Sequence, residues 1–271
     1  MKISDMLIVS DLDGTLVPAM AGISRENLEA IARFREKGGS FTIATGRSPA
    51  SARPYLDLLE VHQGIICNNG SVVYHVDWGR PVWYKPLPPI FRQIIQDVEA
   101  YDPTVAIEGI NIRDEYYLVA SNEELENIVT VHGLKAFHCT AQELPDDCCK
   151  VLFAIPLEEF SRVSGWIRSR SYPGVEFVAS GGDCFEMLPE GINKGYPLEE
   201  LAETYGKSLK NTIAVGDFYN DIEMIRHAGI GVAMGNAPDE VKAAADHVTG
   251  RCEENGMAEL IGWLMEHHEE L

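Results

Sequence analysis

The strongest constraint on the fold is the alternation of strand-like and helix-like segments that opens the chain. Apolar runs typical of buried strands occur at residues 6–11, 40–46 and 64–70, and helix-like stretches at 24–39 and 48–60 separate them. Strands joined by helices of this length need right-handed crossovers, which place the strands parallel in one sheet. The first third of the chain therefore predicts a doubly wound α/β fold.

The pattern changes after the proline-rich stretch 83–89, which is typical of a linker. An amphipathic helix is expected at 90–101, and two short strands at 104–110 and 115–120 follow with only a turn between them. Further segments are expected as strands at 150–155, 175–180 and 184–189 and as a helix at 157–170. Strands paired without a helix between them indicate a mixed or antiparallel sheet with helices on one face. We therefore expect an inserted α+β domain at about residues 86–186.

The first pattern then returns. Helices are expected at 191–206, 220–229, 238–246 and 256–270, and strands at 211–217, 230–235 and 247–250. These segments complete the first domain, so the sequence predicts a parallel-sheet core made of residues 1–85 and 187–271 around the insert. A chain of 271 residues is long enough for two modest domains.

The charge balance narrows the possible partners. Acidic residues outnumber basic ones 42 to 22, which gives a formal net charge of −20. A chain this acidic repels nucleic-acid backbone and anionic membrane surfaces. Small anions are not excluded, because a bound divalent cation and one lysine reverse the sign of the charge within a pocket.

The six cysteines form no C-x-x-C pair, and their spacing matches neither a zinc site nor a disulfide framework. Free thiols fit a reducing compartment. The apolar run near the N-terminus is too short for a signal peptide, and no stretch approaches the ~20 apolar residues of a membrane span. We expect a cytoplasmic protein; nothing in the pattern specifies an oligomeric state.

Polar residues gather where the expected parallel strands end. Ligands of parallel α/β sheets bind beyond the carboxyl ends of the strands, so these positions are candidate site residues. They are Asp11 and Asp13 after the first strand, Thr45, Gly46 and Arg47 after the second, Asn69 after the third, Asp217, Asn220 and Asp221 after 211–217, and Lys194 at the head of a helix.

Several carboxylates beside one lysine suit a magnesium-dependent phosphate site. Mg²⁺ prefers oxygen ligands and is usually held by few protein carboxylates together with waters and substrate oxygens. Lys194 supplies a compact positive charge for a phosphate oxygen. Of the pair Asp11 and Asp13, one carboxylate can attack phosphorus, and the other can protonate the leaving alcohol and later activate water.

These residues also resemble a known family. The segments "DLDGTL" at 11–16, "IATGRS" at 43–48, "GINKG" around Lys194 and "GDFYND" at 216–221 resemble the four motifs of the haloacid dehalogenase (HAD) superfamily, in the same order. Segments such as "FEMLPEGINKG" and "GVAMGNAPDEVKAAADHVT" are similar to the Cof-type phosphatases, which carry a type IIB cap. The resemblance implies a Rossmann-like core, with the insert as a cap over the active site.

The resemblance also implies individual roles. Asp11 is the expected nucleophile and a Mg²⁺ ligand, and Asp13 is the expected acid/base, which binds the metal through its backbone carbonyl. Asp217 is expected as a direct metal ligand, with Asp221 closer to the second shell. The residues expected to hold the phosphoryl group are Thr45, Gly46, Lys194 and Asn220, and Arg47 and Asn69 are expected to face the cap.

Structural alternatives stay open for some of these residues. Asp221 also suits a helix N-cap, and Arg47 a surface cation. Glu186, just before the chain re-enters the core, fits a role in holding Lys194 or in capping a linker equally well.

The sequence therefore predicts Mg²⁺-dependent hydrolysis of a phosphomonoester through an aspartyl-phosphate, on sugar phosphates or similar small metabolites. One alternative is a phosphomutase of the same fold. The other is a non-catalytic regulator that binds a phosphorylated metabolite.

Overall fold

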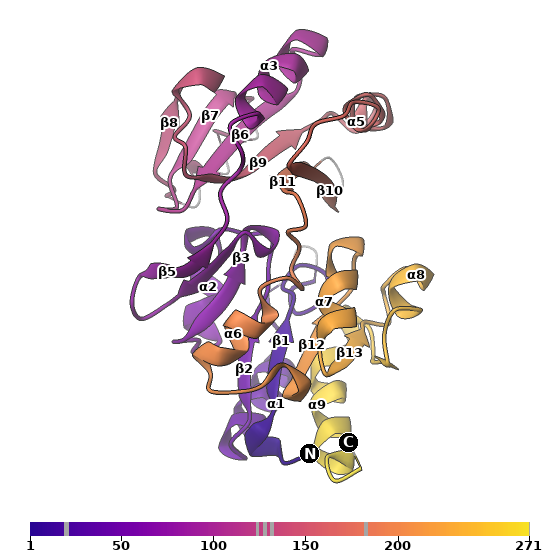
Figure 1. The fold of residues 1–271 in the computed structure, drawn as a ribbon. Helices are drawn as coiled ribbons and strands as arrows, with labels where there is room; N and C mark the ends of the chain where they lie inside the picture. The colour runs from indigo at the N-terminus through magenta and orange to yellow at the C-terminus, as the bar shows by residue number, and fades with distance from the viewer. Residues whose placement is uncertain (19–21, 123–124, 127–128, 131–132, 182–183, 271) are drawn as a thin grey trace.

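The structure of the chain is a computed structural model, and it describes residues 1–18, 22–122, 125–126, 129–130, 133–181 and 184–270. Figure 1 shows a parallel sheet with its helices in the lower half and a second, larger sheet above it. The two chain ends lie near each other at the base. Within the described residues, no helix is both long and apolar enough to cross a membrane.

The lower half is built on a five-stranded sheet with strand order β14-β13-β12-β1-β2. Every neighbouring pair in it is parallel. The strands are β1 (Leu7–Ser10), β2 (Ser40–Ile43), β12 (Thr212–Gly216), β13 (Ile230–Ala233) and β14 (His247–Val248). All four residues of β1 are buried, as a central strand covered on both faces requires. The predicted parallel core is confirmed.

Helices cover both faces of this sheet (Figure 1). On one face, Ile8 and Phe41 pack with α1 (Arg25–Glu36) and α9 (Gly256–His267). On the other face, Leu7 packs with α6 (Leu198–Thr204) and α7 (Ile222–His227). The alternation of neighbouring strand residues between the two faces produces the two layers. The remaining core helices are α2 (Pro49–Leu58) and α8 (Asp239–Lys242).

The third predicted strand exists and lies parallel beside the end of β2, but its regular ladder is antiparallel. β3 (Gly64–Cys67) contacts the β2 segment through one parallel bridge, Ala44 to Ile66, and through the Thr42 hydroxyl, which donates to the Gly64 carbonyl at 2.7 Å. It pairs antiparallel with β4 (Val72–His75), which pairs in turn with β5 (Arg80–Tyr84). The chain reverses into this hairpin at the tight turn η2 (Asn68–Gly70), where three successive residues have positive φ. A side chain at Gly70 would also meet the carbonyl oxygen of Asn193 at 2.0 Å.

The upper half is a six-stranded sheet with strand order β10-β11-β9-β6-β7-β8. Its strands are β6 (Ala106–Asn111), β7 (Tyr116–Ala120), β8 (Ala136–His138), β9 (Cys148–Ala154), β10 (Val175–Gly181) and β11 (Cys184–Pro189). Its pairs are antiparallel except β7–β8. Helices α3 (Phe91–Tyr101) and α5 (Phe160–Arg168) share one apolar core with the sheet. The predicted α+β insert, with helices against one face of its sheet, is confirmed.

Short 3₁₀ helices complete the described secondary structure. They are η1 (Ile3–Asp5), η2 given above, η3 (Ala141–Glu143), η4 (Leu209–Asn211), η5 (Tyr219–Asp221) and η6 (Cys252–Glu254).

Two crossings connect the halves, one after β5 and one through the end of β11 (Figure 1). The side chain of Lys85 donates a hydrogen bond of 2.9 Å to the carbonyl of Glu190, so the two crossings contact each other. We propose the limits 86–186 for the insert and 1–85 with 187–271 for the core. β11 continues to Pro189, so the second limit falls within a strand.

Candidate active site

The carboxyl ends of three neighbouring strands bring the predicted residues together. Asp11 directly follows β1, Thr45 lies two residues beyond β2, and Asp217 directly follows β12. The strand order β12-β1-β2 makes these ends adjacent. Asp11 is 5% exposed and Thr45 is 1% exposed. A sheet edge with buried polar side chains is where a parallel α/β protein binds its ligand.

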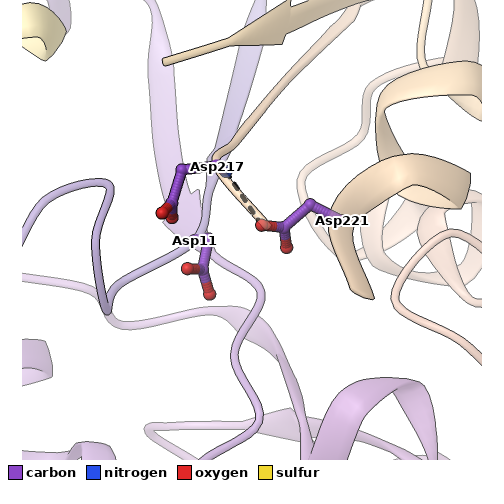
Figure 2. A group of neighbouring side chains, drawn as sticks. All are labelled: Asp11, Asp217 and Asp221. Atoms are coloured by element: carbon purple, nitrogen blue, oxygen red, sulfur yellow. Dashed lines mark hydrogen bonds between the residues drawn. The ribbon is translucent and has the colours of Figure 1, made fainter. Parts of the chain in front are cut away.

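Three aspartates form a compact carboxylate cluster. Asp11, Asp217 and Asp221 each offer an oxygen, and these oxygens lie within 4.8 Å of one another. Figure 2 shows the three side chains around one point, with a hydrogen bond from the Asp217 backbone N–H to the Asp221 carboxylate. Burial raises the pKa of Asp217 to about 6, and the charge of Asp221 adds to the rise. A cluster of this kind favours a cation among the three groups.

Lys194 binds two of the three clustered aspartates. Its Nζ donates to Asp11 Oδ1 at 2.7 Å and to Asp221 Oδ1 at 2.6 Å, and the side chain is 1% exposed. Burial opposes the charge on Lys194, but the two carboxylates outweigh it and raise the pKa of the ammonium group. Burial likewise raises the pKa of Asp11 well above its ordinary value, against the opposing effect of Lys194.

The local chain around Lys194 differs from the prediction. Residues 191–206 were expected as one helix, but α6 begins only at Leu198. The Oδ1 atom of Asn193 accepts hydrogen bonds from the backbone N–H groups of Gly195 and Tyr196, both at 3.0 Å. These bonds close a turn at 193–196, and Pro197, directly before α6, disfavours helical backbone at the residue that precedes it. Lys194 therefore reaches the cluster from a turn.

Asp221 precedes α7, but its side chain makes no N-cap hydrogen bond to that helix, so the expected N-cap role was wrong; its carboxylate bonds backward instead. Its Oδ2 accepts hydrogen bonds from the backbone N–H groups of Asp217 and Phe218, at 2.9 and 3.0 Å, and so closes the turn at η5. Its Oδ1 pairs with Lys194. Both oxygens are therefore engaged by strong donors, and Asp221 is fully buried.

Asp217 is held more loosely, by residues that the sequence reasoning did not select. Thr15 donates its hydroxyl to Asp217 Oδ1 at 2.8 Å, and the Asn236 amide donates to Oδ2 at 3.2 Å. Carboxylate oxygens accept more than one bond each, so lone pairs remain for a cation. Gly14 has a φ of +86°, and a side chain there would meet Asp217 Oδ2 at 2.4 Å. Nothing in a single sequence distinguishes Thr15 or Asn236 from ordinary loop residues.

Asp13 is not part of the carboxylate cluster. Arg47 holds it with two hydrogen bonds, of 2.8 and 2.7 Å, in a fork-to-fork pair. The Asp13 side chain is 53% exposed and the Arg47 side chain 25% exposed. The Arg47 guanidinium also lies over the ring of Tyr55, 5.0 Å from its centre. Both residues line the cavity described below.

The other predicted residues form a layer between the two halves. The Thr45 hydroxyl accepts a hydrogen bond of 3.1 Å from the backbone N–H of Arg47. Asn220 donates to Asn69 at 3.0 Å, and Asn69 donates to Glu186 of the upper sheet at 2.6 Å. Glu186 therefore contacts neither Lys194 nor a linker amide through a described hydrogen bond, so neither expected role is supported.

A cavity of about 530 Å³ opens between the two halves above the cluster. Its lower wall includes Asp11, Lys194 and Asp217. Its upper wall includes Glu108 and Lys150 from the inserted sheet. Lys150 was missed in the sequence; its signal was a charged residue inside the apolar run "CCKVLF". Its Nζ donates to the carbonyl of Gly46 at 2.7 Å and so bonds the upper sheet to the loop after β2.

The donor set fits a divalent cation. Three clustered carboxylates, of which Asp11 and Asp221 are buried, and the buried Lys194 ammonium group carry a net charge of −2 when all are ionised, and burial makes that excess costly. A hard dication with oxygen ligands neutralises it. The cluster and the cavity above it thus make a site for a cation and an anionic group together.

Comparison with known proteins agrees with this geometry. The family profile of the haloacid dehalogenase-like hydrolases matches residues 8–261. A 5-amino-6-(5-phospho-D-ribitylamino)uracil phosphatase of Bacillus subtilis is 31% identical over 96% of this chain and 98% of its own length. An HMP-PP phosphatase of Serratia proteamaculans is 30% identical over 95% of each chain. The solved structure of a sugar phosphatase of HAD subclass IIB superposes with a TM-score of 0.79, at 25% identity, over 96% of this chain and 99% of that one.

Proposed function

The chain belongs to the haloacid dehalogenase-like hydrolases and is a phosphatase of the Cof type with a IIB cap, and from this membership we propose its reaction. It hydrolyses phosphomonoesters of small metabolites such as sugar phosphates, with Mg²⁺, through an aspartyl-phosphate on Asp11. The observation that carries the proposal is the buried Asp11 carboxylate, 2.7 Å from Lys194 and beside two further aspartates.

In the first half-reaction, an Asp11 carboxylate oxygen forms a bond to phosphorus, and the bond from phosphorus to the ester oxygen breaks. Asp13 gives its proton to that leaving oxygen, which departs as an alcohol. In the second half-reaction, Asp13 takes a proton from water as the water oxygen attacks phosphorus. Phosphate leaves, and Asp11 returns to its free carboxylate.

The residues around Asp11 are proposed to hold the metal ion and the phosphoryl group. Asp11, Asp217 and Asp221 and the backbone carbonyl of Asp13 would hold Mg²⁺. Bound Mg²⁺ supplies positive charge against the phosphoryl oxygens, which the carboxylates alone would repel. The side chains and backbone groups proposed to bind the phosphoryl group are those of Thr45, Gly46, Arg47, Lys194 and Asn220.

The substrate class follows from the relatives and the cavity. Two relatives are named as phosphatases of small phosphorylated metabolites, and a third is named as a sugar phosphatase. A cavity of about 530 Å³ accommodates one such molecule. We propose a cytoplasmic location, which is supported by buried thiols such as Cys67 and Cys149 outside any disulfide.

Product analysis tests the reaction. Incubation with Mg²⁺ and p-nitrophenyl phosphate, and separately with hexose phosphates, is expected to release free phosphate. An isomerised sugar phosphate without free phosphate would instead identify a phosphomutase. Binding without turnover of any ester would identify a regulator. Either result would overturn the proposal.

The metal assignment predicts unequal effects of two substitutions. Asp217→Asn is expected to raise the Mg²⁺ concentration for half-maximal activity by about 10–100-fold or more, the range typical of changes around metal sites. Asp221→Asn is expected to raise it less, because both oxygens of Asp221 already bind Lys194 and backbone N–H groups. A Mg²⁺ titration of the rate measures both, and equal shifts would contradict the assignment.

The same cluster predicts a pH-dependent stabilisation by Mg²⁺. The pKa of Asp217 is about 6 in the fold, above its ordinary 3.8, so the folded state binds this proton more tightly. That contribution to stability is complete below 3.8 and is lost as the pH rises through about 6. Mg²⁺ replaces the lost proton, so the increase in Tm on adding Mg²⁺ should be larger at pH 7.5 than at pH 5. An increase independent of pH would contradict this expectation.

A further inference from the structure

The face of the inserted sheet that looks toward the active site carries three buried charges. Glu108 lies on β6, Lys150 on β9 and Glu186 on β11, and they are 4%, 5% and 4% exposed. The pairing register places Glu108 and Glu186 opposite the same residue, Leu152, and Lys150 opposite Ile110. Paired residues share a face of a sheet, and residues two apart on one strand do as well. All three charges therefore belong to one face.

The other face of the same strands is apolar. Ile107, Phe153 and Phe185 are register partners, are fully buried and belong to the core shared with α3 and α5. In Figure 1, α3 lies above this sheet, on the side away from the parallel sheet. The three charges on the opposite face are buried as well, and burying a charge is costly unless it has a partner.

Two of the three charges have partners in the described chain. Lys150 donates to the Gly46 carbonyl at 2.7 Å and lies 3.3 Å from Glu186. Glu186 also accepts from Asn69 at 2.6 Å and from Ser180 at 2.7 Å. The hydrogen-bonding groups of Lys150 and Glu186 are therefore already engaged by residues at the boundary between the two halves.

Glu108 differs from both. No described residue donates a hydrogen bond to its carboxyl group, although the side chain lines the cavity opposite the carboxylate cluster. Burial raises the pKa of Glu108 to about 7, with Lys150 opposing the rise and Glu186 adding to it. Within the part of the chain that the structure describes, the carboxyl group thus has no donor, and it lines the space that the leaving group of a phosphate ester would fill.

We propose that Glu108 selects the substrate by accepting a hydrogen bond from a hydroxyl or amino group of the leaving group. This inference rests on the proposed function, because it assigns the upper wall of that same site. The substrate class is a monophosphate whose leaving group carries hydroxyl or amino donors and no second anionic group. Two carboxylates and one ammonium group at this wall disfavour a further negative charge.

Three probe esters test the proposal. Sorbitol 6-phosphate carries hydroxyl donors, hexyl phosphate has the same chain length without them, and 6-phosphogluconate adds a carboxylate. The unmodified protein is expected to prefer sorbitol 6-phosphate over both in kcat/KM. Glu108→Leu should lower the sorbitol-to-hexyl ratio by about 10-fold or more, since sites that hydrogen-bond a substrate hydroxyl discriminate strongly against analogues without it.

Glu108→Gln keeps an acceptor and removes the charge. It should therefore retain more of the sorbitol-to-hexyl ratio than the leucine variant and should raise the gluconate-to-sorbitol ratio. Glu99→Leu is the matched control, because Glu99 lies on α3, outside the cavity lining, and its carboxyl pKa is also raised by burial. This control should leave both ratios unchanged. The Tm of each variant reports whether it folds.

The outcomes separate the two proposals. If the unmodified protein releases no phosphate from p-nitrophenyl phosphate with Mg²⁺, the proposed function itself fails. If it does so but shows no preference for sorbitol 6-phosphate, or if the ratios do not move in folded Glu108 variants, only the assignment of Glu108 is overturned.

Discussion

Asp11→Asn is expected to reduce turnover by about 10⁴-fold or more, the order of loss seen when an enzyme's nucleophile is removed. The amide has nearly the same shape as the carboxylate, but its oxygen is a far weaker nucleophile toward phosphorus. The fold should survive the change. Burial already disfavours the charged form of Asp11, and Lys194 keeps Asp221 as its other partner at 2.6 Å.

The experiment combines kinetics with detection of the covalent intermediate. Acid quenching of the unmodified protein with labelled substrate should trap one phosphoryl group on the chain, and peptide mapping should locate it at Asp11. The Asn variant should carry no label. Asp102→Asn is a matched control, because Asp102 is also buried, at 6% exposed, but lies in the insert and bonds to Thr104 and Arg162. Turnover retained in Asp11→Asn, or label at another residue, would exclude Asp11 as the nucleophile.

The site residues that could be predicted from the sequence are those that follow an apolar strand. Asp11 and Asp217 end apolar strands, and parallel strands bring such ends to one edge whatever the rest of the chain does. The motifs around Thr45 and Lys194 then indicated the protein family. Membership and the α/β core with its cap could therefore be predicted without coordinates.

The secondary-structure elements that the sequence predicted incorrectly lie at turns, where a few residues set the direction of the chain. The β3–β4 hairpin was not predicted, and it forms because the residues of η2 adopt positive φ and reverse the chain after β3. The helix expected from residue 191 begins only at Leu198, after the turn that Asn193 closes and after Pro197. Strand and helix periodicity carries no information about such bonds.

Contacts between the two halves also could not be predicted from the sequence. Lys150 lies 104 residues from Gly46, and Glu186 lies 117 residues from Asn69, yet each pair is hydrogen-bonded. The register of β6, β9 and β11 is what turns Glu108 and Lys150 toward the cavity. A one-residue change of register would turn them into the apolar core instead, so their roles could be inferred only after the sheet was known.

Asp13→Asn is expected to reduce turnover of alkyl phosphates by about 10²–10⁴-fold, the range typical of losing a general acid or base. Asp13 is proposed to carry the proton in both half-reactions. An alkoxide leaves poorly without a proton, whereas p-nitrophenolate leaves readily as an anion. The first half-reaction should therefore suffer less with p-nitrophenyl phosphate, and the second half-reaction should be slowed equally for both esters.

Mixing the Asn variant rapidly with p-nitrophenyl phosphate should then give a burst of nitrophenolate, followed by slow turnover while the phosphorylated Asp11 accumulates. Asp57→Asn is the matched control. Asp57 is 60% exposed and pairs with Arg53, much as Asp13 is 53% exposed and pairs with Arg47, so it reports the loss of an exposed ion pair alone. That control should leave the rate unchanged. Equal losses for alkyl and nitrophenyl esters without a burst would exclude Asp13 as the proton carrier.

The stereochemistry at phosphorus tests both aspartates in one measurement. Transfer to Asp11 and then to water consists of two displacements, and each inverts the configuration. A phosphate ester made chiral with oxygen isotopes, hydrolysed by the unmodified protein, should therefore give phosphate with net retention. Net inversion would mean a single attack by water. Asp11 would then serve only as a partner of Lys194 and a candidate cation ligand, and Asp13 would have one proton to move instead of two.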